Sequence, residues 1–454
     1  MNSNVDLFEN KKVSHAVISL AIPTIISQVI TVIYNIADTF FIGQLNNPDM
    51  VAAASIVLPL FIFLNAISNL FGIGGASLIS RSLGEKNFEK AKKTSTFAIY
   101  TAIFTALFYG ILVFFLRPFL LPLIGANNET YDYSYEYMLW TIVIGAVPTV
   151  FNTMISHLIR AQGFAKTASF GMTLGGILNI ILDPIFIFGF KQDIIGAAMA
   201  TMIANTLASL FFIITIVILL KKKRLILSFN IKNYTIKEKI PSEVMLVGLP
   251  SALLTSFAVV SNICMNTIME QYQNEAVAGL GIAKKIDLLA FSIAMGLSQG
   301  VLPLIGYNYS AKNIKRMNAV IKFTFALSLS FEIIATFLLF TLASPIIRLF
   351  IQDEVTVAYG TTFQMIICLG GPFIGITLVV STIFQAIGYK FRPLVLSLLR
   401  KGAVDIPVMF ILDHFIGKNG VAISTVVAEI VGVTVAIIMF IVFVQRNKKE
   451  IELI

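Results

Sequence analysis

Twelve long apolar runs constrain the fold of this chain more than any other feature of its sequence. A helix needs about 20 mostly apolar residues to cross the hydrocarbon core of a bilayer. Hydrophobic residues make up 57% of the 454 residues and charged residues only 13%, unlike soluble globular proteins. The runs lie near residues 15–43, 52–80, 94–116, 134–159, 167–190, 194–220, 243–270, 276–308, 318–343, 356–385, 393–415 and 419–445. The sequence therefore predicts an all-α polytopic membrane protein with 12 transmembrane helices.

The net charge of +9 indicates topology rather than a nucleic-acid partner. Most Lys and Arg residues lie at the two termini and in every second loop, at 81–93, 160–166, 221–239, 312–322 and 390–401. The alternate loops contain only Arg117, Lys191, Arg348 and Lys418. This asymmetry is the positive-inside pattern, which places both termini in the cytoplasm. We expect a multi-pass protein of the plasma (inner) membrane, and the richness in Ile, Asn and Lys favours a bacterial origin.

Several other classes of protein are disfavoured by the sequence. Cys264 and Cys368 both fall within predicted spans, which disfavours a disulfide framework. His15, His157 and His414 show no metal-ligand spacing, so we expect no cofactor and no metal beyond a possible Na⁺. An intramembrane hydrolase would need an H-E-x-x-H run, a paired-Asp motif or a deep Ser-His pair, and the sequence contains none of these. The first apolar run lacks a small-x-small cleavage site and is expected to remain as a membrane helix.

The chain resembles itself at offsets of 224 to 227 residues. The matching segments are Ala21-Ile-Pro23 with Gly248-Leu-Pro250, Lys86-Asn87 with Lys312-Asn313, Ala161-Gln-Gly163 with Ala386-Ile-Gly388, and Gly196–Thr201 with Gly420–Thr425. Each half holds six spans, an even number, so both halves enter the membrane in the same orientation. Such parallel repeats are related by a pseudo-two-fold axis along the membrane normal, as in some secondary transporters. We expect an N-terminal lobe at 1–225, a cytoplasmic linker at 226–240 and a C-terminal lobe at 241–454.

The fifth apolar run contains an amide and a carboxylate one helical turn apart, Asn179 and Asp183, followed at once by Pro184. An ionised Asp in hydrocarbon costs roughly 2.5–3.5 kcal/mol on insertion scales, so such residues usually mark an ion or substrate pathway. The proline removes one backbone hydrogen bond and is a candidate hinge. These residues predict a site of transport function within the membrane.

A depth argument extends this site to three helices. If the first span ends near residue 43, Asp38 lies about 7–8 Å below the outer end, at 1.5 Å per residue. Asp183 and Thr201 each lie about 10 Å below that end, and Asn179 is one turn deeper on the face of Asp183. Oxygen ligands suit Na⁺, and two neighbouring buried carboxylates suit a proton. The sequence predicts a site for H⁺ or Na⁺ and does not choose between them. Thr201 also has a purely structural interpretation, since a membrane Thr often bonds its own backbone.

The first span also carries a polar stripe beside Asp38, made by Ser27, Gln28, Thr31, Tyr34 and Asn35. A polar stripe in lipid must face protein or water. It would line a central substrate cavity, with Tyr34 available for cation–π contact, or it would only form hydrogen bonds between helices. Pro23, near the start of the same span, is a second candidate hinge.

Charged residues of the second half form a different pattern. They are Lys284, Lys285, Asp287, Asp405 and Glu429. Lys401 lies one turn from Asp405 and could neutralise it. These residues either form a buried structural network of opposite charges or provide a second cation or substrate site.

The sequence resembles the MATE (multidrug and toxic compound extrusion) family, most like its MepA-like branch. The resemblance lies in the segment Asn179–Gly189, in Asp38–Gly43 and Ser80–Gly84, which end the first two spans, and in the six-plus-six layout. It implies a V-shaped secondary active transporter that exports small organic cations, drugs and dyes, in exchange for H⁺ or Na⁺ by alternating access. It also implies that the positions of Asp38, Asn179, Asp183 and Thr201 form the cation site. Some relatives carry acids in their seventh and tenth spans, which this chain lacks, so the resemblance favours coupling in the N-terminal lobe.

The alternative is a flippase for lipid-linked oligosaccharides or other lipid carriers, of a related fold. A cavity for pyrophosphate-linked lipids should contain Arg or Lys from several helices. The first-half spans contain acids and, from the sequence, no buried basic residue. We therefore favour the exporter, and expect a monomer.

Overall fold

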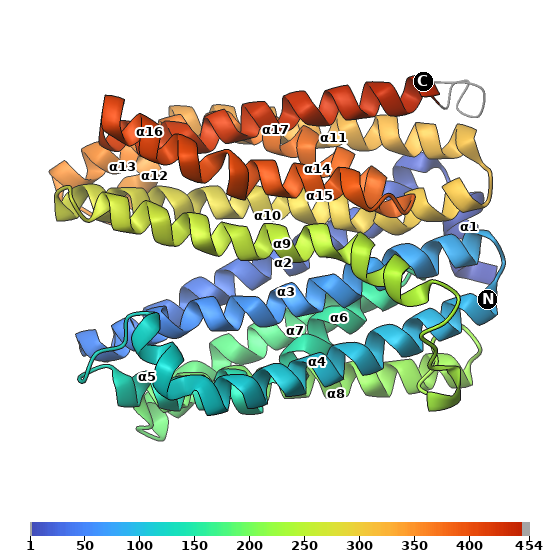
Figure 1. The fold of residues 1–454 in the computed structure, drawn as a ribbon, viewed down its shortest axis with the longest axis horizontal. Coiled ribbons are helices and arrows are strands. Elements are labelled where there is room, and N and C mark those ends of the chain that lie inside the picture. Colours follow the sequence, from blue (N-terminus) through green and yellow to red (C-terminus); the bar gives the residue numbers. More distant parts are fainter. Residues whose placement is uncertain (1, 447–454) are drawn as a thin grey trace.

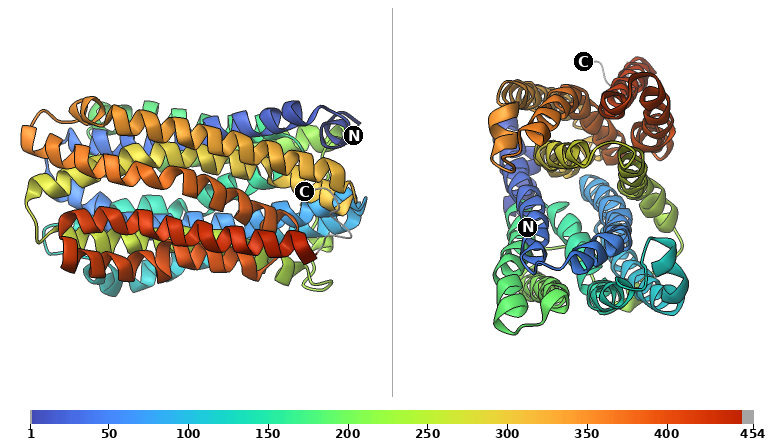
Figure 2. Two further views of the ribbon diagram at one scale, coloured as in Figure 1. Left: turned by 90° about the horizontal axis from the view of Figure 1, so that it is seen from above. Right: turned by 90° about the vertical axis from the view of Figure 1, so that its left-hand side faces the viewer.

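The computed structural model describes residues 2–446, and helices run side by side along its longest axis in two groups (Figure 1). The first group is α1 (Asn2–Glu9), α2 (Val13–Gly43), α3 (Pro48–Gly84), α4 (Phe88–Leu123), α5 (Tyr131–Met138), η1 (Leu139–Ile144), α6 (Ala146–Arg160), α7 (Ala165–Pro184), η2 (Ile185–Gly189) and α8 (Asp193–Lys221). After η3 (Ile231–Asn233), the second group is α9 (Ile240–Met269), α10 (Asn274–Ser310), α11 (Ile314–Thr341), α12 (Ala343–Arg348), α13 (Glu354–Ile367), η4 (Cys368–Gly370), α14 (Gly371–Ala386), α15 (Phe391–Leu398), η5 (Leu399–Ala403), α16 (Asp405–Ile416) and α17 (Lys418–Arg446). We call α2–α8 the N lobe and α9–α17 the C lobe. The two groups are also distinct in the end-on view of Figure 2.

Ten helical segments of the described chain are long and apolar enough to cross a membrane, and one bent pair raises the number to eleven. That pair is Tyr131–Ile144 with Ala146–Arg160, which meet at 49°. The remaining predicted span, 393–415, is present as α15, η5 and α16, and its centre is a π-helical turn that contains Arg400 and Lys401. This span is therefore divided into two short helices and is less apolar than the others.

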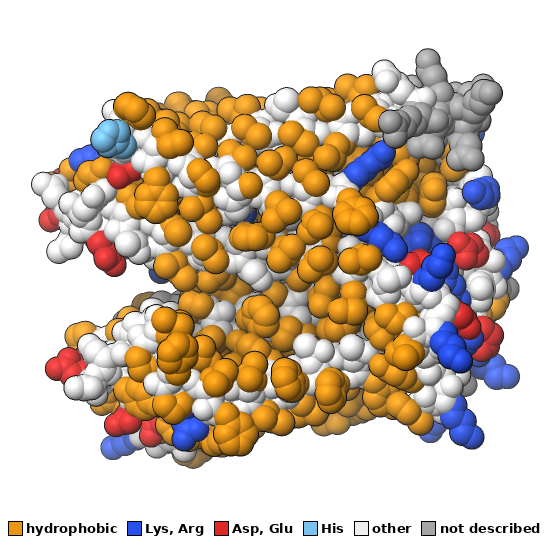
Figure 3. Space-filling model, viewed as in Figure 1, with side chains coloured by type: hydrophobic (Ala, Val, Ile, Leu, Met, Phe, Trp, Pro, Cys, Tyr) orange, Lys and Arg blue, Asp and Glu red, His pale blue; other side chains and the backbone are white. Residues whose placement is uncertain are grey.

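The molecule is apolar along its length and charged at one end. In the space-filling view, hydrophobic side chains cover much of both lobes, and most Lys and Arg side chains gather at the end where both termini lie (Figure 3). We call this the terminal end. At the opposite end, which we call the open end, the surface is hollowed between the two lobes (Figure 3). The lobes therefore diverge from the terminal end toward the open end.

Two symmetric helix crossings join the lobes, α3 with α9 and α2 with α10. A Cβ at Gly300 of α10 would lie 2.9 Å from the Cα of Ala21 in α2. At the other crossing, a Cβ at Gly74 of α3 would overlap the carbonyl of Val244 in α9, and Gly248 of α9 approaches α3 just as closely. Since any side chain would separate these backbones, the absence of a Cβ permits the close approach.

The repeated Lys-Asn pair has the same structural role in both lobes. Lys86 and Lys312 have positive φ angles of 57° and 61°, which reverse the chain after α3 and α10. The side chains of Asn87 and Asn313 then accept hydrogen bonds from backbone N–H groups of the next helices, α4 and α11. Each Asn therefore satisfies a donor that the first turn of a helix leaves free.

The other repeat matches also have a physical reason. Gly163 and Gly388 have φ angles of 85° and 86°, a region that residues with a Cβ rarely adopt. At Gly196 a Cβ would lie 2.7 Å from the backbone of Phe186, and Gly420 is equally tight against α16. The internal similarity therefore reflects turns and close helix contacts rather than the chemistry of a site.

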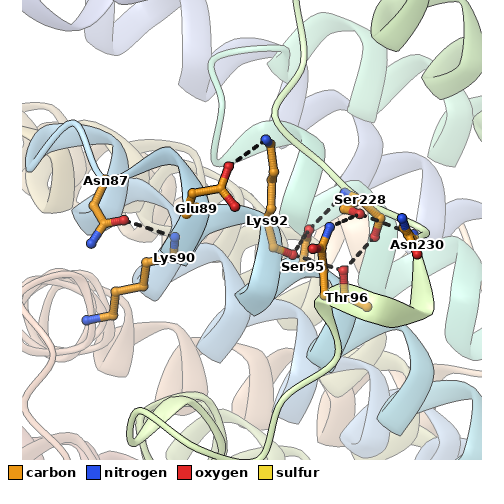
Figure 4. A network of polar contacts seen from close by, with 9 residues as sticks. Asn87, Glu89, Lys90, Lys92, Ser95, Thr96, Ser228 and Asn230 are labelled. Atoms are coloured by element: carbon orange, nitrogen blue, oxygen red, sulfur yellow. Dashed lines mark hydrogen bonds and ion pairs between the residues drawn. The ribbon is translucent and has the colours of Figure 1, made fainter.

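The segment between the lobes runs along the terminal end of α4 (Figure 4). Ser95 of α4 accepts a hydrogen bond from the backbone N–H of Ser228 at 3.1 Å, and Thr96 donates to the carbonyl of Ser228 at 2.9 Å. Nearby, Lys92 forms an ion pair with Glu89 at 2.7 Å. The connection between the lobes is thus attached to the N lobe.

Helix α1 attaches the start of the chain to the C lobe. Phe8 is buried and its ring stacks on Tyr307 of α10, whose hydroxyl donates to Glu9 at 2.6 Å. Arg316 of α11 donates to the backbone carbonyls of Phe8 at 2.6 Å and Leu7 at 3.2 Å. Because α2 follows directly, α1 links the first helix of the N lobe to the terminal end of the C lobe.

Candidate functional site

A buried polar cluster joins α7 to α8 in the N lobe. The amide nitrogen of Asn179 donates to Asp183 Oδ1 and to Thr201 Oγ1, each at 3.1 Å. Asp183 is fully buried, and Asn179 and Thr201 are 2% and 8% exposed. The structure thus brings together three of the four residues that the depth argument selected.

Asp38 reaches the same cluster from α2, through a residue that the sequence argument missed. The hydroxyl of Tyr137 in α5 donates to Asp38 Oδ2 at 3.3 Å, and Tyr137 lies close enough to Asp38 and Asp183 to interact with both charges. Tyr137 is six residues into α5 and so lies about 9 Å along it. The depth argument missed it, because the fourth span was predicted to begin near residue 134, which places Tyr137 only about 4–5 Å below the outer end.

Three oxygen acceptors in this cluster are buried without a hydrogen-bond donor: Asp38 Oδ1, Asp183 Oδ2 and Asn179 Oδ1. Asp38 and Asp183 are close enough for their charges to interact. Neither carboxylate forms an ion pair with a basic side chain in residues 2–446. Buried acceptors normally find partners, and hard oxygens of this kind suit a proton or Na⁺. The described residues contain no group of three His, Cys, Asp or Glu side chains suited to a metal ion.

The two candidate hinges differ in local structure. Helix α2 runs as one helix through Pro23. Pro184 ends α7, and the chain continues directly in the π-helical turn η2. Wider turns of this type often occur at functional sites. The local structure beside Asp183 is therefore irregular, whereas the helical assignment at Pro23 is not interrupted.

A polar cavity of about 160 Å³ lies beside the cluster. All five residues of the polar stripe on α2 line it, together with Asn179 and Thr201. Met295 and Gln299 of α10 also line it, and Gln28 donates to Gln299 at 2.9 Å. The stripe thus lines a cavity and also forms a hydrogen bond between the lobes, so the two interpretations of it are compatible.

The expectation that the first-half spans contain no buried basic residue is wrong. Arg160 is 3% exposed and lines the same cavity, as does His157. The sequence argument assigned Arg160 to a loop because it lies at the end of an apolar run. In the structure it is the last residue of α6, and the chain turns only at Gly163.

Two of the C-lobe carboxylates are paired with cations, and one of those cations, Arg400, was also assigned to a loop. Arg400 of η5 binds both carboxylate oxygens of Glu429 at 2.7 and 2.9 Å, with both side chains almost fully buried. Asp405 accepts from Ser261 at 2.6 Å and lies 3.6 Å from Lys401. The neighbouring Lys401 therefore does pair with Asp405, but Glu429 has a separate partner.

Some of the remaining charged residues of the C lobe interact with one another, and others do not. Lys284 donates to Asn262 and contacts the sulfur of Met265 at 3.2 Å. Asp287 lies close enough to Lys284 and Lys401 to interact with both. Glu332 of α11 is 2% exposed and was missed by the sequence argument. Lys285 is exposed, and no ion pair to it is found among the described residues.

The comparisons with known proteins decide the family. The MatE family model matches residues 23–185 and 250–411, once in each lobe. The chain belongs to the MatE family. The multidrug export protein MepA of Staphylococcus haemolyticus is 33% identical over 446 residues, covering 98% of this chain and 96% of that protein. MepA of Staphylococcus aureus is 32% identical over 445 residues, 98% of this chain and 97% of the relative.

Solved MATE structures share the fold. A MATE protein crystallised in the straight conformation matches with a TM-score of 0.91 at 23% identity, covering 99% of this chain and all of that one. An outward-facing multidrug resistance MATE transporter matches at 0.89 and 24% identity, covering 99% of both chains. The prediction of a two-lobed, twelve-helix membrane fold is therefore confirmed.

Proposed function

We propose that this MatE protein is a secondary active exporter of organic cations, driven by antiport with H⁺ or Na⁺. The observation that carries the proposal is a pair of carboxylates without cationic partners, Asp38 and Asp183, each with a buried oxygen that no donor satisfies, beside a polar cavity in the N lobe. Asn179 and Thr201 complete the coupling site. The relatives named as multidrug export proteins support this function.

The charge distribution supports an orientation with the terminal end in the cytoplasm. Lys and Arg gather there, as the positive-inside rule requires of the cytoplasmic side. The hollow between the lobes then faces outward. We place the protein in the cell membrane of a bacterium as a monomer, with lobes at 1–225 and 241–454 joined by a cytoplasmic linker at 226–240.

The unpaired carboxylates give a direct mechanism for exchange. Uptake of H⁺ or Na⁺ from outside neutralises Asp38 and Asp183, which removes their attraction for an organic cation held by the polar stripe of α2. Irregular turns such as that after Pro184, or bending of α2 near Pro23, then let the site relax as the cation leaves. The lobes rock inward and the coupling ion is released to the cytoplasm.

The available energy suffices for this exchange. A pH difference provides about 1.4 kcal/mol per unit, and the membrane potential about 2.3 kcal/mol per charge per 100 mV. Tenfold concentration of a substrate requires about 1.4 kcal/mol. One coupling ion can therefore drive substantial accumulation.

The flippase alternative gains one observation, because Arg160 does line the cavity. A pyrophosphate-linked lipid would still need several cations from different helices. In the described structure the cavity lining contains one arginine, with His157 beside it. The exporter therefore remains the better supported function.

The test is transport of a fluorescent organic cation into inside-out proteoliposomes with an acidic lumen or, separately, a Na⁺-loaded lumen. We expect one of these gradients to drive accumulation of the dye. Accumulation under the pH gradient identifies H⁺ as the coupling ion, and accumulation under the Na⁺ gradient alone identifies Na⁺. Absence of transport under both gradients would contradict the exporter and favour the flippase.

A further inference from the structure

The two lobes are closed against each other at the terminal end, next to the glycine crossing of α3 and α9. Beyond Gly74, α3 continues along the C lobe. Ser77 is fully buried and donates to the backbone carbonyl of Gln385 in α14 at 2.5 Å. A Cβ at Gly84 would lie 2.3 Å from the carbonyl of Tyr307 in α10. This part of α3 therefore forms a tight contact between the lobes, whereas the surface at the open end is hollowed between them (Figure 3).

Two ion pairs, both made by Glu243, span this contact. Glu243 lies in the first turn of α9, 3.2 Å from Arg81 of α3 and 3.7 Å from Lys90 of α4. Both cations belong to the N lobe, and among the described residues no other ion pair joins the two lobes. The guanidinium of Arg81 also packs on Gly388 of the C lobe, where a Cβ would lie 2.6 Å from Nη1. The charge of Glu243 is thus compensated from the opposite lobe.

The position of these ion pairs makes them sensitive to the angle between the lobes. Arg81 lies seven residues beyond Gly74 along α3, about 10 Å from the crossing with α9. Glu243 lies five residues before Gly248 along α9, about 7–8 Å from the same crossing and on the same side of it. A rocking of the lobes about this crossing that opens the terminal end must therefore separate Arg81 from Glu243.

An interaction that exists in only one of two states shifts the equilibrium between them. The pair of Arg81 with Glu243 meets this condition, because it can form only while the terminal end is closed. The pair of Arg400 with Glu429 does not, since both residues lie in the C lobe. The side chains of Arg81 and Glu243 are only 14% and 20% exposed, so water screens their attraction less than it screens a surface ion pair.

We propose that Arg81 and Glu243 form the gate at the terminal end, and that their ion pair sets how often this end opens. They are positioning residues, which act on the angle between the lobes rather than on the transported ions. This inference rests on the rocking of the lobes in the proposed export function and adds the residues that regulate it. The repeat equivalent of Arg81 is Tyr307, whose hydroxyl donates to Glu9 of α1. Duplication alone therefore does not account for the pair of Arg81 with Glu243.

The experiment measures how often the terminal end opens, with a buried cysteine as the reporter. Ser77→Cys is introduced into protein that carries Cys264→Ala and Cys368→Ala, and is labelled with a water-soluble maleimide in nanodiscs. Both faces of a nanodisc are accessible, so the result does not depend on the orientation in the membrane. Thr94→Cys, equally buried near the same end but inside the N lobe, reports loosening of that lobe itself. When opening is fast relative to labelling, the labelling rate follows the population of the open form.

Arg81→Gln should raise the labelling rate of the Ser77→Cys reporter about tenfold, which corresponds to about 1.4 kcal/mol. The rate at Thr94→Cys should change less than about twofold. Glu243→Gln should have at least the same effect as Arg81→Gln, because it also releases Lys90. The double variant should label about as fast as Glu243→Gln alone, since the two changes break the same interaction. Arg81→Lys should retain part of the closure, because it keeps the charge but not the fork.

Lys93→Gln is the matched control. It breaks an ion pair between α4 and the connecting segment near the same end, and should label like the wild type. Unchanged labelling of the Ser77→Cys reporter in Arg81→Gln would overturn the gate, as would an equal rise at both reporters. An equal rise in Lys93→Gln, or effects of Arg81→Gln and Glu243→Gln that multiply in full, would also overturn it.

Dye transport tests the export function separately from the gate. A wild-type protein that does not export the dye would contradict the export function. If its variants still showed the expected labelling, the gate would stand.

Discussion

Carboxylates are buried in both lobes, and two of those in the C lobe, Glu429 and Asp405, are paired with cations, whereas Glu332 of the C lobe and the N-lobe pair have no ion pair among the described residues. Glu429 is held by Arg400 through two hydrogen bonds, and Asp405 by Ser261 and Lys401. In the N lobe, Asp38 and Asp183 each have a neutral donor and a second oxygen without one. The lobes share a fold by duplication but differ in how they compensate buried charge.

This difference assigns different roles to the two clusters. A carboxylate that is already neutralised by an arginine gains little from a proton or Na⁺. A carboxylate with a free buried oxygen can gain a full ionic partner. The N-lobe pair is therefore the expected coupling site, and the C-lobe network the expected structural element. Each prediction below tests one side of this comparison.

The largest effect is expected from Asp183→Asn. The amide has nearly the same shape as the carboxylate and can still accept the hydrogen bond from Asn179. It lacks the charge that the coupling ion neutralises. Gradient-driven dye export should fall to the level of protein-free liposomes, while the amount of protein in the membrane stays unchanged. Asp132→Asn, at an exposed site near the start of α5, is the matched control. Full export by Asp183→Asn would exclude coupling through this carboxylate.

The next largest effect is expected from Glu429→Gln, which should lower the stability of the protein rather than act on transport directly. It leaves Arg400 buried without a charge partner, at a cost of about 3–5 kcal/mol. The thermal midpoint in detergent should fall, whereas Glu354→Gln, which breaks the exposed pair with Arg348, should leave it unchanged.

A double variant then distinguishes structure from function in the C lobe. Arg400→Met with Glu429→Leu replaces the pair by apolar side chains, which is often neutral for stability. We expect normal folding and retained export. A double variant that folds but does not export would show that the C-lobe pair takes part in transport.

A smaller effect is expected from Tyr137→Phe. It removes one hydrogen bond to the charged carboxylate of Asp38, worth about 1.5 kcal/mol or roughly tenfold in an equilibrium. A carboxylate that has lost a donor holds a cation more tightly, so half-maximal export should occur at a lower concentration of the coupling ion. Tyr133→Phe on the same helix is the control. Complete loss of export would mean that Tyr137 does more than adjust Asp38.

The smallest effect is expected from Lys285→Ala. Lys285 is exposed and lies outside the C-lobe network, whereas Lys284 contacts Asn262 and Met265. The rate of export should change less than about twofold, and the thermal midpoint by about a degree or less. Surface substitutions are usually near neutral. A clear loss in Lys285→Ala, equal to that in Lys284→Ala, would extend the network to this residue.

Features that depend on distance along a helix could be predicted from the sequence. Apolar length located the spans, and depth selected Asp38, Asn179, Asp183 and Thr201. The sequence did not reveal which side of a helix a charged residue faces. Arg160, at the end of α6, and Arg400, near the centre of the span at 393–415, were therefore counted with the loop charges, although both are buried.

Contacts between side chains on different helices also could not be predicted from the sequence. Glu332 and the Arg400–Glu429 pair depend on the rotation and packing of separate helices, for which the sequence offers no local signal. Tyr137 was missed because α5 begins three residues before the predicted start of the fourth span, so its depth was underestimated. The limit was thus set by tertiary packing rather than by the chemistry of the residues.

The symmetric helix crossings between the lobes bear on the ancestry of the protein. Ala21 of α2 meets Gly300 of α10, and their repeat equivalents, Gly248 of α9 and Gly74 of α3, meet at the other crossing. When residue i contacts j and the equivalent of j contacts the equivalent of i, the interface is isologous, as in a two-fold homodimer. A single six-helix precursor could therefore have assembled through this same surface with a second copy of itself. Fusion of the two genes would then have preserved an existing contact and left each half free to acquire its own charges.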